Sequence, residues 1–363
     1  MKRTKLKLAS LLLAVLFVAA ALVACAQTPA ATSAAPSEPA AASATPSESA
    51  AASEAAAPAK LLDRPLQLGY YQGSCELHWY AAEKLGLFQK YGLDVEWTVV
   101  NDANAATSLA AGKIDATDGI LQGWVKPIEQ GLDIRFTLGM QQGCMSTVTL
   151  ADAPYTKLED LKGKTIGVLG TIGGGPHNYL TRTILNTTKL DPAKDFEYVA
   201  FADPAALISA LETGKVQAIT SVDSLNYAGV TAKKFKWLTV MATDEYLKPE
   251  TCCLLAFNPK FIEEHKDAAA AFTKAVYEAS LYAQDHKEEL IQYAFDKGYI
   301  INGTPEDNLA IADLYEWAPG YDIAVSSFSN SFKDYQTAGL IDKNVNLQKV
   351  LDRTFVKLLD DVK

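Results

Sequence analysis

The feature that most constrains the fold is a strand–helix pattern that occurs twice in the chain. The first copy, DVEWTVVNDANAATSLAAGKIDATDG, begins at Asp94, and the second, DFEYVAFADPAALISALETGKVQAITSVDS, begins at Asp195. The copies align with Glu96 opposite Glu197, about 100 residues further along. A match of this length indicates duplication or a shared architecture, against the alternative of a chance likeness. The pattern therefore predicts two similar units in one chain.

Each copy follows a further strand and helix. The run LQLGYYQ (66–72) alternates apolar residues as a strand does, and KTIGVLG (164–170) is its counterpart. Helical segments follow both runs, and such alternation predicts mainly parallel sheets covered by helices. Ligands of open α/β sheets bind beyond the carboxyl ends of the strands. We therefore expect one cleft between the two α/β lobes, lined by four turns at 72–78, 118–122, 170–177 and 221–225.

Two segments are expected to carry the chain between the lobes as a two-strand hinge. CMSTVTLADAP would leave lobe one, and CCLLAFNP would return to it. The predicted boundaries assign 61–148 and 255–363 to lobe one and 149–254 to lobe two. The residues from 260 onward have helical patterns and are expected to pack on lobe one. A cleft bounded by two lobes can close on its ligand through hinge motion.

The first 24 residues have the pattern of a secretory leader, with a basic start and an apolar run over 11–23. The run ends in Leu-Val-Ala-Cys, which is typical of a bacterial lipobox, so we expect cleavage before Cys25 and lipidation of its sulfur. The alternative is an ordinary leader with a chance cysteine. The predicted location is the outer face of the cell membrane.

Residues 25–60 are nearly all Ala, Ser, Thr, Pro and Glu. Such a segment has too little apolar surface to offset the entropy of ordering, so we expect a disordered tether. Removing the four basic residues of the leader takes the formal net charge from −10 to −14. This acidic balance, without a basic patch, argues against nucleic acid as a partner.

Four cysteines remain in the globular part, namely Cys75, Cys144, Cys252 and Cys253. They permit three complete disulfide pairings, among which the sequence does not choose, and a fully reduced set is the alternative. The adjacent pair is poorly placed to bond to itself. The histidines show no metal-ligand spacing, so no metal is expected.

Several stretches resemble one family of transport proteins. They are LGYYQGSCELHWYAAEKLGLFQKYGLDVEW, SLAAGKIDA, LEDLKGKTIGV and LISALETGKVQA. They look like the sulfonate, nitrate, taurine and thiamine-precursor solute-binding proteins, the capture subunits of ABC importers. The resemblance covers about 62–290 and implies a bilobal periplasmic-binding-protein-like fold of type II. It also implies a small-molecule solute, an ABC permease and ATPase as partners, a monomeric state and no cofactor.

The resemblance points to first-turn residues of both lobes as ligand contacts. Lobe one would contribute Gln72, Ser74, Cys75, Glu76, His78, Asp118 and Gln122. Lobe two would contribute Thr171, Gly173, Gly174, Gly175, His177 and Asp223. Each residue also has a structural interpretation, because aspartates commonly end strands or cap helices and a histidine can be an ordinary helix residue. Trp317, in a Pro/Gly turn, is a candidate cover for the cleft or a packing anchor.

The glycine-rich stretch GTIGGGPHNYL (170–180) meets neither nucleotide-binding motif. Pro176 and His177 stand where a P-loop has Lys and Ser or Thr, and Asn178 stands at the last glycine position of G-x-G-x-x-G. The stretch retains a close backbone approach and a helix N-terminus, which favour a small oxyanion or polar head. We interpret it as the lobe-two half of a solute clamp.

The polar residues of the four turns bear on the type of ligand. No arginine lies in them, whereas Glu76, Asp118 and Asp223 lie in or beside three of them. Carboxylates suit an amine or an aminopyrimidine, and a zwitterion such as taurine would use both carboxylates and backbone N–H groups. A sulfonate- or taurine-like solute, or an aminopyrimidine thiamine precursor, is therefore expected. A pyrimidine-synthase-like enzyme and a sensory ectodomain are the competing functions, and we expect no enzymatic activity.

Overall fold

The first sheet combines segments from two distant parts of the chain. In this computed structural model, residues 58–101 and 104–362 are described, so the leader, Cys25 and nearly all of the tether lie outside the described residues. The strand order is β2-β1-β3-β10-β4. The bounds are β1 (Leu66–Tyr70), β2 (Val95–Val99), β3 (Ala116–Ile120), β4 (Arg135–Gly139) and β10 (Cys253–Phe257). We call this sheet and its helices lobe one.

Strands β1, β2 and β3 are parallel, with Leu66 opposite Val95, while β10 runs antiparallel between β3 and β4. Short helices connect the strands because glycines interrupt longer ones. Gly86, at φ +64°, separates two of them, a conformation that glycine adopts without strain. The helices of this part are η1 (Ser74–Glu76), α1 (Leu77–Lys84), α2 (Leu87–Lys90), α3 (Ala105–Ala110) and α4 (Leu121–Glu129).

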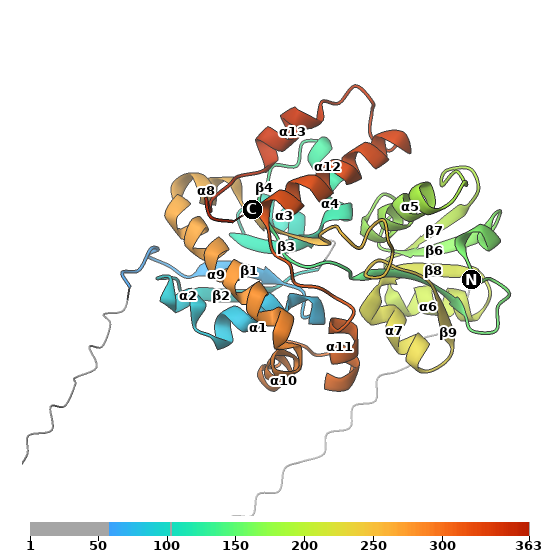
Figure 1. Ribbon diagram of the computed structural model, residues 1–363, viewed down its shortest axis with the longest axis horizontal. Coiled ribbons are helices and arrows are strands. Elements are labelled where there is room, and N and C mark those ends of the chain that lie inside the picture. The colour runs from blue at the N-terminus through green and yellow to red at the C-terminus, as the bar shows by residue number, and fades with distance from the viewer. Residues whose placement is uncertain (1–57, 102–103, 363) are drawn as a thin grey trace, which may run out of the picture. The chain divides into compact units, whose positions relative to one another are not determined.

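The second sheet repeats this plan in the order β7-β6-β8-β5-β9. Its strands are β5 (Met145–Leu150), β6 (Thr165–Leu169), β7 (Glu197–Phe201), β8 (Ala218–Val222) and β9 (Phe235–Val240). Its helices are η2 (Leu158–Leu161), α5 (Gly175–Thr187), α6 (Pro204–Glu212) and α7 (Asp223–Thr231). Figure 1 shows α5, α6 and α7 around these strands, which we call lobe two. In both sheets the fourth strand is antiparallel, so the doubled pattern is confirmed at the level of topology.

Each antiparallel strand directly follows a crossing between the lobes. The chain passes from β4 to β5 and returns from β9 to β10. The chain thus passes from one sheet to the other a few residues before the boundaries that the sequence predicted. Those boundaries, 148/149 and 254/255, fall inside β5 and β10. The two-lobed α/β fold with two connections is confirmed.

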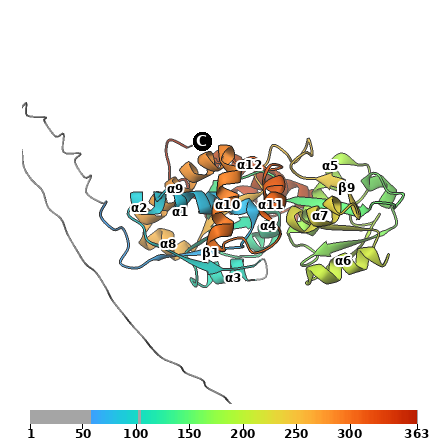
Figure 2. The same ribbon diagram turned by 90° about the horizontal axis from the view of Figure 1, so that it is seen from below.

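The remaining residues form helices that mostly pack on lobe one. They are α8 (Pro259–Glu264), α9 (Lys266–Asp285), α10 (Lys287–Lys297), α11 (Pro305–Ala312), α12 (Tyr321–Thr337) and α13 (Leu347–Thr354). Helix α9 lies against α1, and α12 lies against β4 and α4. Figure 2 shows α8, α9 and α10 grouped beside α1 and β1. No helix within 58–101 or 104–362 is long and apolar enough to cross a membrane.

The lobes contact each other directly, and the described residues belong to one compact unit. Helix α5 of lobe two packs on α4 and α12, and α7 packs on α11. A hydrophobic cluster that includes Leu68 and Ala116 of lobe one also contains Met145 and Tyr179 of lobe two. The strand ends that were expected to form the site therefore meet inside the protein.

Candidate ligand-binding site

The turn after β1 is held by the carboxylate of Glu76. Its oxygens accept hydrogen bonds from the backbone nitrogens of Tyr71 (2.7 Å) and Gly73 (3.0 Å) and from the Tyr80 hydroxyl (3.4 Å). Burial raises the pKa of Glu76 to about 7 despite these bonds. Glu76 thus shapes the turn that presents Cys75, a structural role that the sequence did not indicate.

His78 and Asp118 form the buried centre of the lobe-one half. His78 is in the first turn of α1, and its Nε2 lies 3.8 Å from Oδ2 of Asp118 in the middle of β3. Both residues are buried, and neither ring nitrogen of His78 has a hydrogen-bond partner in the structure. Burial lowers the pKa of His78 to about 3, so the ring is neutral at physiological pH. A neutral imidazole here offers one donor and one acceptor.

Asp223 forms the corresponding centre of lobe two. It begins α7 and is fully buried. Neither of its carboxylate oxygens has a hydrogen-bond partner among the described residues. Burial raises the pKa of Asp223 to about 6, although Ser146, Tyr315 and the Cys144 backbone N–H lie close enough to lower it. A buried carboxylate with unused acceptors is a candidate ligand contact.

Cys75 and Tyr315 connect these two halves. Burial raises the pKa of Cys75, and the nearby Cys253, Glu76 and Asp118 raise it further. Burial likewise raises the pKa of Tyr315, helped by the charges of Asp223 and Cys75. The charge of Asp118 thus acts on the half-buried Cys75, and the charge of Asp223 acts on the buried Tyr315. Tyr315 follows α11, and no sequence pattern singled it out.

Three more side chains present unused polar atoms in the interior. Both amide atoms of Gln122 and of Gln141 lack partners, as does the indole nitrogen of Trp317. Gln122 is in the first turn of α4, and the ring of Trp317 lies 6.1 Å from that of Tyr315. Buried polar atoms are normally hydrogen-bonded, so these side chains are candidates for contacts with a polar ligand. Gln141, just after β4, was missed because it follows a strand outside the doubled pattern.

The glycine-rich loop lies at a contact between the two lobes. It opens α5, and a Cβ atom added at Gly123 of lobe one would lie 3.3 Å from the backbone nitrogen of Gly175. The Asn178 side chain also donates to the carbonyl of Gln122 (2.9 Å) and to that of Gly173 (2.7 Å). Gly123 and Gly175 thus permit a close approach of α4 and α5, and a ligand contact of this loop stays a prediction.

The other predicted residues are distributed as follows. His177 is buried edge-to-face on Tyr198 of lobe two, 4.7 Å between ring centroids, and its pKa is lowered by burial. Ser74 is buried, Gln72 is partly buried at φ +62°, and Thr171 is exposed. The interactions described above thus bring Cys75, Glu76, His78, Asp118 and Asp223 into one region, whereas His177 packs within lobe two. Their contacts with a ligand stay a prediction.

Several cationic side chains of the protein form ion pairs or hydrogen bonds with groups other than Asp118 and Asp223. Among the described arginines, Arg64 pairs with Asp115, and Arg182 pairs with Glu250 and Asp334. Lys287 donates a hydrogen bond to the carbonyl of Tyr315 (2.8 Å), and its ammonium group lies over the Trp317 ring. Acidic side chains also lie near this ammonium group. The guanidinium groups of Arg64 and Arg182 are therefore used in these ion pairs.

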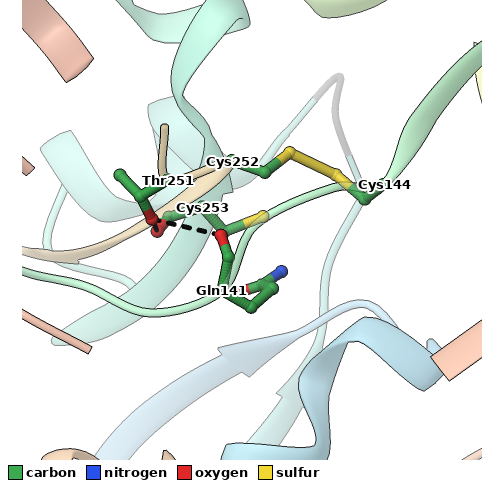
Figure 3. Close-up of a disulfide and its surroundings, with 5 residues drawn as sticks. All are labelled: Gln141, Cys144, Thr251, Cys252 and Cys253. Carbon is green, nitrogen blue, oxygen red and sulfur yellow. Dashed lines mark hydrogen bonds between the residues drawn. A yellow bond between two sulfur atoms is a disulfide. The ribbon is translucent and has the colours of Figure 1, made fainter. Parts of the chain in front are cut away.

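The structure selects one disulfide, between Cys144 and Cys252 (Figure 3). Cys75 and Cys253 are outside it, and the adjacent cysteines are not bonded to each other. The sulfur atoms of Cys144, Cys252 and Cys253 all lie within 4.8 Å of one another. The structure thus holds one bond and not a complete pairing of the four cysteines, and tertiary contacts between residues distant in sequence decide which two cysteines bond.

The fold has well-defined counterparts among solved structures. The periplasmic nitrate-binding protein NrtA from Synechocystis PCC 6803 superposes with a TM-score of 0.68 at 15% identity, over 80% of this chain and 86% of that chain. The periplasmic aliphatic sulphonate binding protein SsuA from Escherichia coli gives 0.63 at 16% identity, over 81% and 92%. The fold is that of the periplasmic binding proteins.

The family is shown by the sequence itself. Residues 77–290 match the family described as NMT1/THI5 like, and the chain belongs to it. A protein of Bacillus subtilis (strain 168) named "Putative binding protein YtlA" is 26% identical over 216 residues. That match spans 57% of this chain and 62% of that protein, so the chain aligns with less than two thirds of its relative.

Proposed function

We propose that this chain is the solute-binding component of an ABC importer and that its solute carries an amine or a similar cationic, hydrogen-bond-donating nitrogen group. The observation that carries this proposal is the pair of buried carboxylates, Asp118 and Asp223, contributed by different lobes. Membership of the NMT1/THI5 like family supports the binding role. An aminopyrimidine fits this description, as does the ammonium end of a taurine-like zwitterion.

Charge supports a nitrogen group over a simple anion. Taking an ion out of water is costly unless a partner of opposite charge replaces the solvent. An oxyanion bound here would face two carboxylates of like charge, whereas an ammonium or protonated aminopyrimidine would be attracted to them. The amides of Gln122 and Gln141 and the indole of Trp317 would bind the remaining polar atoms of the solute. A sulfonate group, if present, would depend on those donors.

Binding is proposed to be coupled to closure of the lobes. A solute that contacts Asp118 and Asp223 together binds the closed form better than the open one, and it shifts the population accordingly. The closed form would then dock on a permease. The leader and Cys25 support an extracytoplasmic, lipid-anchored protein, held by its tether near the membrane as a monomer.

A ligand panel tests this proposal. Thermal-shift and calorimetric measurements would compare 4-amino-2-methylpyrimidine, a short alkylamine, taurine, ethanesulfonate and nitrate, because a ligand of the folded state raises the melting temperature. We expect binding by amine-bearing compounds only. Binding of ethanesulfonate or nitrate without any amine-bearing ligand would contradict the proposed charge preference. Conversion of a bound compound to product, detected by mass spectrometry, would favour the competing enzymatic function.

A further inference from the structure

We propose that the Cys144–Cys252 disulfide positions the two halves of the candidate site relative to each other. Its two cysteines lie on the two crossings between the lobes, one between β4 and β5 and one just before β10. In this proposal the disulfide fixes the relative placement of the two halves and does not only add stability. Its ligand-binding consequence rests on the proposed function, whereas its structural consequence does not.

The Cys144 end holds Asp223. The backbone nitrogen of Asp223 donates to the carbonyl of Cys144 (3.0 Å), and the backbone N–H of Cys144 lies close enough to Asp223 to lower its pKa. Cys144 has φ +97°, next to Gly143 at φ +91°. A non-glycine residue keeps such a conformation only where its surroundings enforce it. The disulfide and the contact with Asp223 provide those surroundings.

The Cys252 end holds the start of α4. The carbonyl of Cys252 accepts from the backbone nitrogen of Leu121 (2.8 Å), the residue before Gln122. Its own nitrogen donates to the carbonyl of Gln141 (2.7 Å), which also accepts from the Thr251 hydroxyl (3.1 Å). Figure 3 shows Gln141 and Thr251 beside the disulfide. Cys252 thus fixes both glutamine-bearing segments of the lobe-one half.

The covalent bond joins these two sets of hydrogen bonds. On one side it reaches Asp223 of lobe two through a single carbonyl, and on the other it reaches Leu121 and Gln141 of lobe one. Without it, the relative placement of the two sides would depend on the noncovalent contacts between the lobes. A site whose contacts come from two lobes binds more tightly when less ordering is needed to bring those contacts together.

The neighbouring thiol determines how the test is built. Because the sulfur of Cys253 lies within 4.8 Å of both bonded sulfurs, a single substitution at either cysteine would leave a partner for a substitute disulfide. The informative variant is therefore Cys144→Ala combined with Cys252→Ala. Cys253→Ala is the matched control, since it removes a buried sulfur from the same cluster and leaves the disulfide intact.

Amide hydrogen exchange measured by NMR decides the structural part. In the double variant we expect exchange at the amides of Asp223 and Leu121 to accelerate about tenfold more than exchange at amides within β6, whose change reports the global loss of stability. The control variant should keep all of these rates. Equal acceleration at every amide would reveal a purely global stabiliser and would overturn the positioning role, as would unchanged rates at Asp223 and Leu121.

Calorimetry with 4-amino-2-methylpyrimidine extends the test to the site. The double variant should bind this probe about tenfold more weakly than the Cys253→Ala control, because preorganisation is lost. Equal affinities would overturn the proposed effect on binding. If the wild-type protein binds neither this probe nor any other amine, the proposed function fails, and the exchange rates still decide the positioning role.

Discussion

Arg182 of α5 donates a hydrogen bond of 2.7 Å to Asp334 of α12 and thereby joins lobe two to lobe one through a buried ion pair. The same guanidinium binds both oxygens of Glu250, on the returning crossing between the lobes. Arg182 is fully buried, so these carboxylates replace the water that its charge has lost. A strongly basic residue inside a two-lobed protein therefore serves the contact between the lobes and not the candidate site.

Replacing this arginine by an apolar residue of similar length should be severely destabilising. Arg182→Met leaves Glu250 buried without its counter-charge, so we expect the free energy of unfolding to fall by about 3–5 kcal/mol. Urea denaturation measures the change. Lys194→Met, which breaks an exposed pair with Asp191, is the matched control and should cause no measurable change. A loss at Arg182 no larger than that of the control would contradict the burial argument.

A methyl group at Gly123 should oppose closure of the lobes. The added Cβ would lie 3.3 Å from the nitrogen of Gly175 in the other lobe, which is tighter than usual packing. Overpacking of this kind costs about 1–3 kcal/mol, so Gly123→Ala should weaken ligand binding about tenfold. The radius of gyration of the liganded variant, measured by X-ray scattering, should exceed that of the wild type. A liganded variant as compact as the wild type would show that α4 and α5 adjust locally.

Asp223→Asn should weaken binding of an amine-bearing solute by about tenfold to a hundredfold, because a charge-assisted contact becomes a neutral one. The wild-type affinity should also fall as the pH drops below about 6, the pKa that burial gives this carboxyl group. Calorimetry between pH 5 and 8 measures both effects. Asp203→Asn is the control, because this residue caps α6 through the Ala206 nitrogen and Asn caps equally well. Retained affinity in Asp223→Asn would remove this residue from the site.

His78 should make the protein sensitive to acid. Its folded-state pKa of about 3 is below its unfolded value, so the unfolded state binds the proton first and stability is lost as the pH falls from about 6.5 toward 3. Glu76 and Asp223, whose pKa values are raised, act in the opposite direction over part of this range. The comparison must therefore be made between wild type and His78→Gln, whose difference in unfolding free energy should change by about 3 kcal/mol between pH 7 and pH 4. Parallel stability curves would contradict the shift.

The disulfide should also contribute to overall stability. It joins cysteines 108 residues apart, and closing a loop of this size in the unfolded chain is worth roughly 4–5 kcal/mol in the chain-entropy description. The double variant Cys144→Ala and Cys252→Ala should lose about 2–5 kcal/mol on urea unfolding. Cys253→Ala, which keeps the crosslink, should lose less. An equal loss in both variants would show that core packing, and not the crosslink, is responsible.

The doubled strand–helix pattern was sufficient to predict the architecture. Strands and helices are specified by short-range periodicity and by turn residues such as Gly86, and two similar units of this size favour two similar sheets. The exact crossing points were harder to predict, since β5 and β10 are apolar strands whose partner sheet depends on distant segments.

Part of the candidate site could be predicted from the sequence for the same reason. Asp118 lies in β3 and Asp223 directly follows β8, the corresponding strand of the second copy, so the pattern placed both near strand ends and the resemblance marked them, with His78, as ligand contacts. Tyr315 and Gln141 were missed because they lie outside the repeated units. The glycines of 170–177 were predicted to let the backbone come close to another group. The group that comes close to Gly175 is Gly123, which lies in the other lobe.

The amino-acid sequence by itself determined the elements, the duplication, the family and the strand ends where a site can form, because these depend on neighbours close along the chain. Only the tertiary structure decided that Cys144 pairs with Cys252, that Arg182 is buried between the lobes, and that the charges of carboxylates from both lobes act on Cys75 and Tyr315. The physical reason is that each of these relationships joins residues far apart in sequence. Their energies depend on burial and on the loss of water, which exist only once the two lobes have packed together.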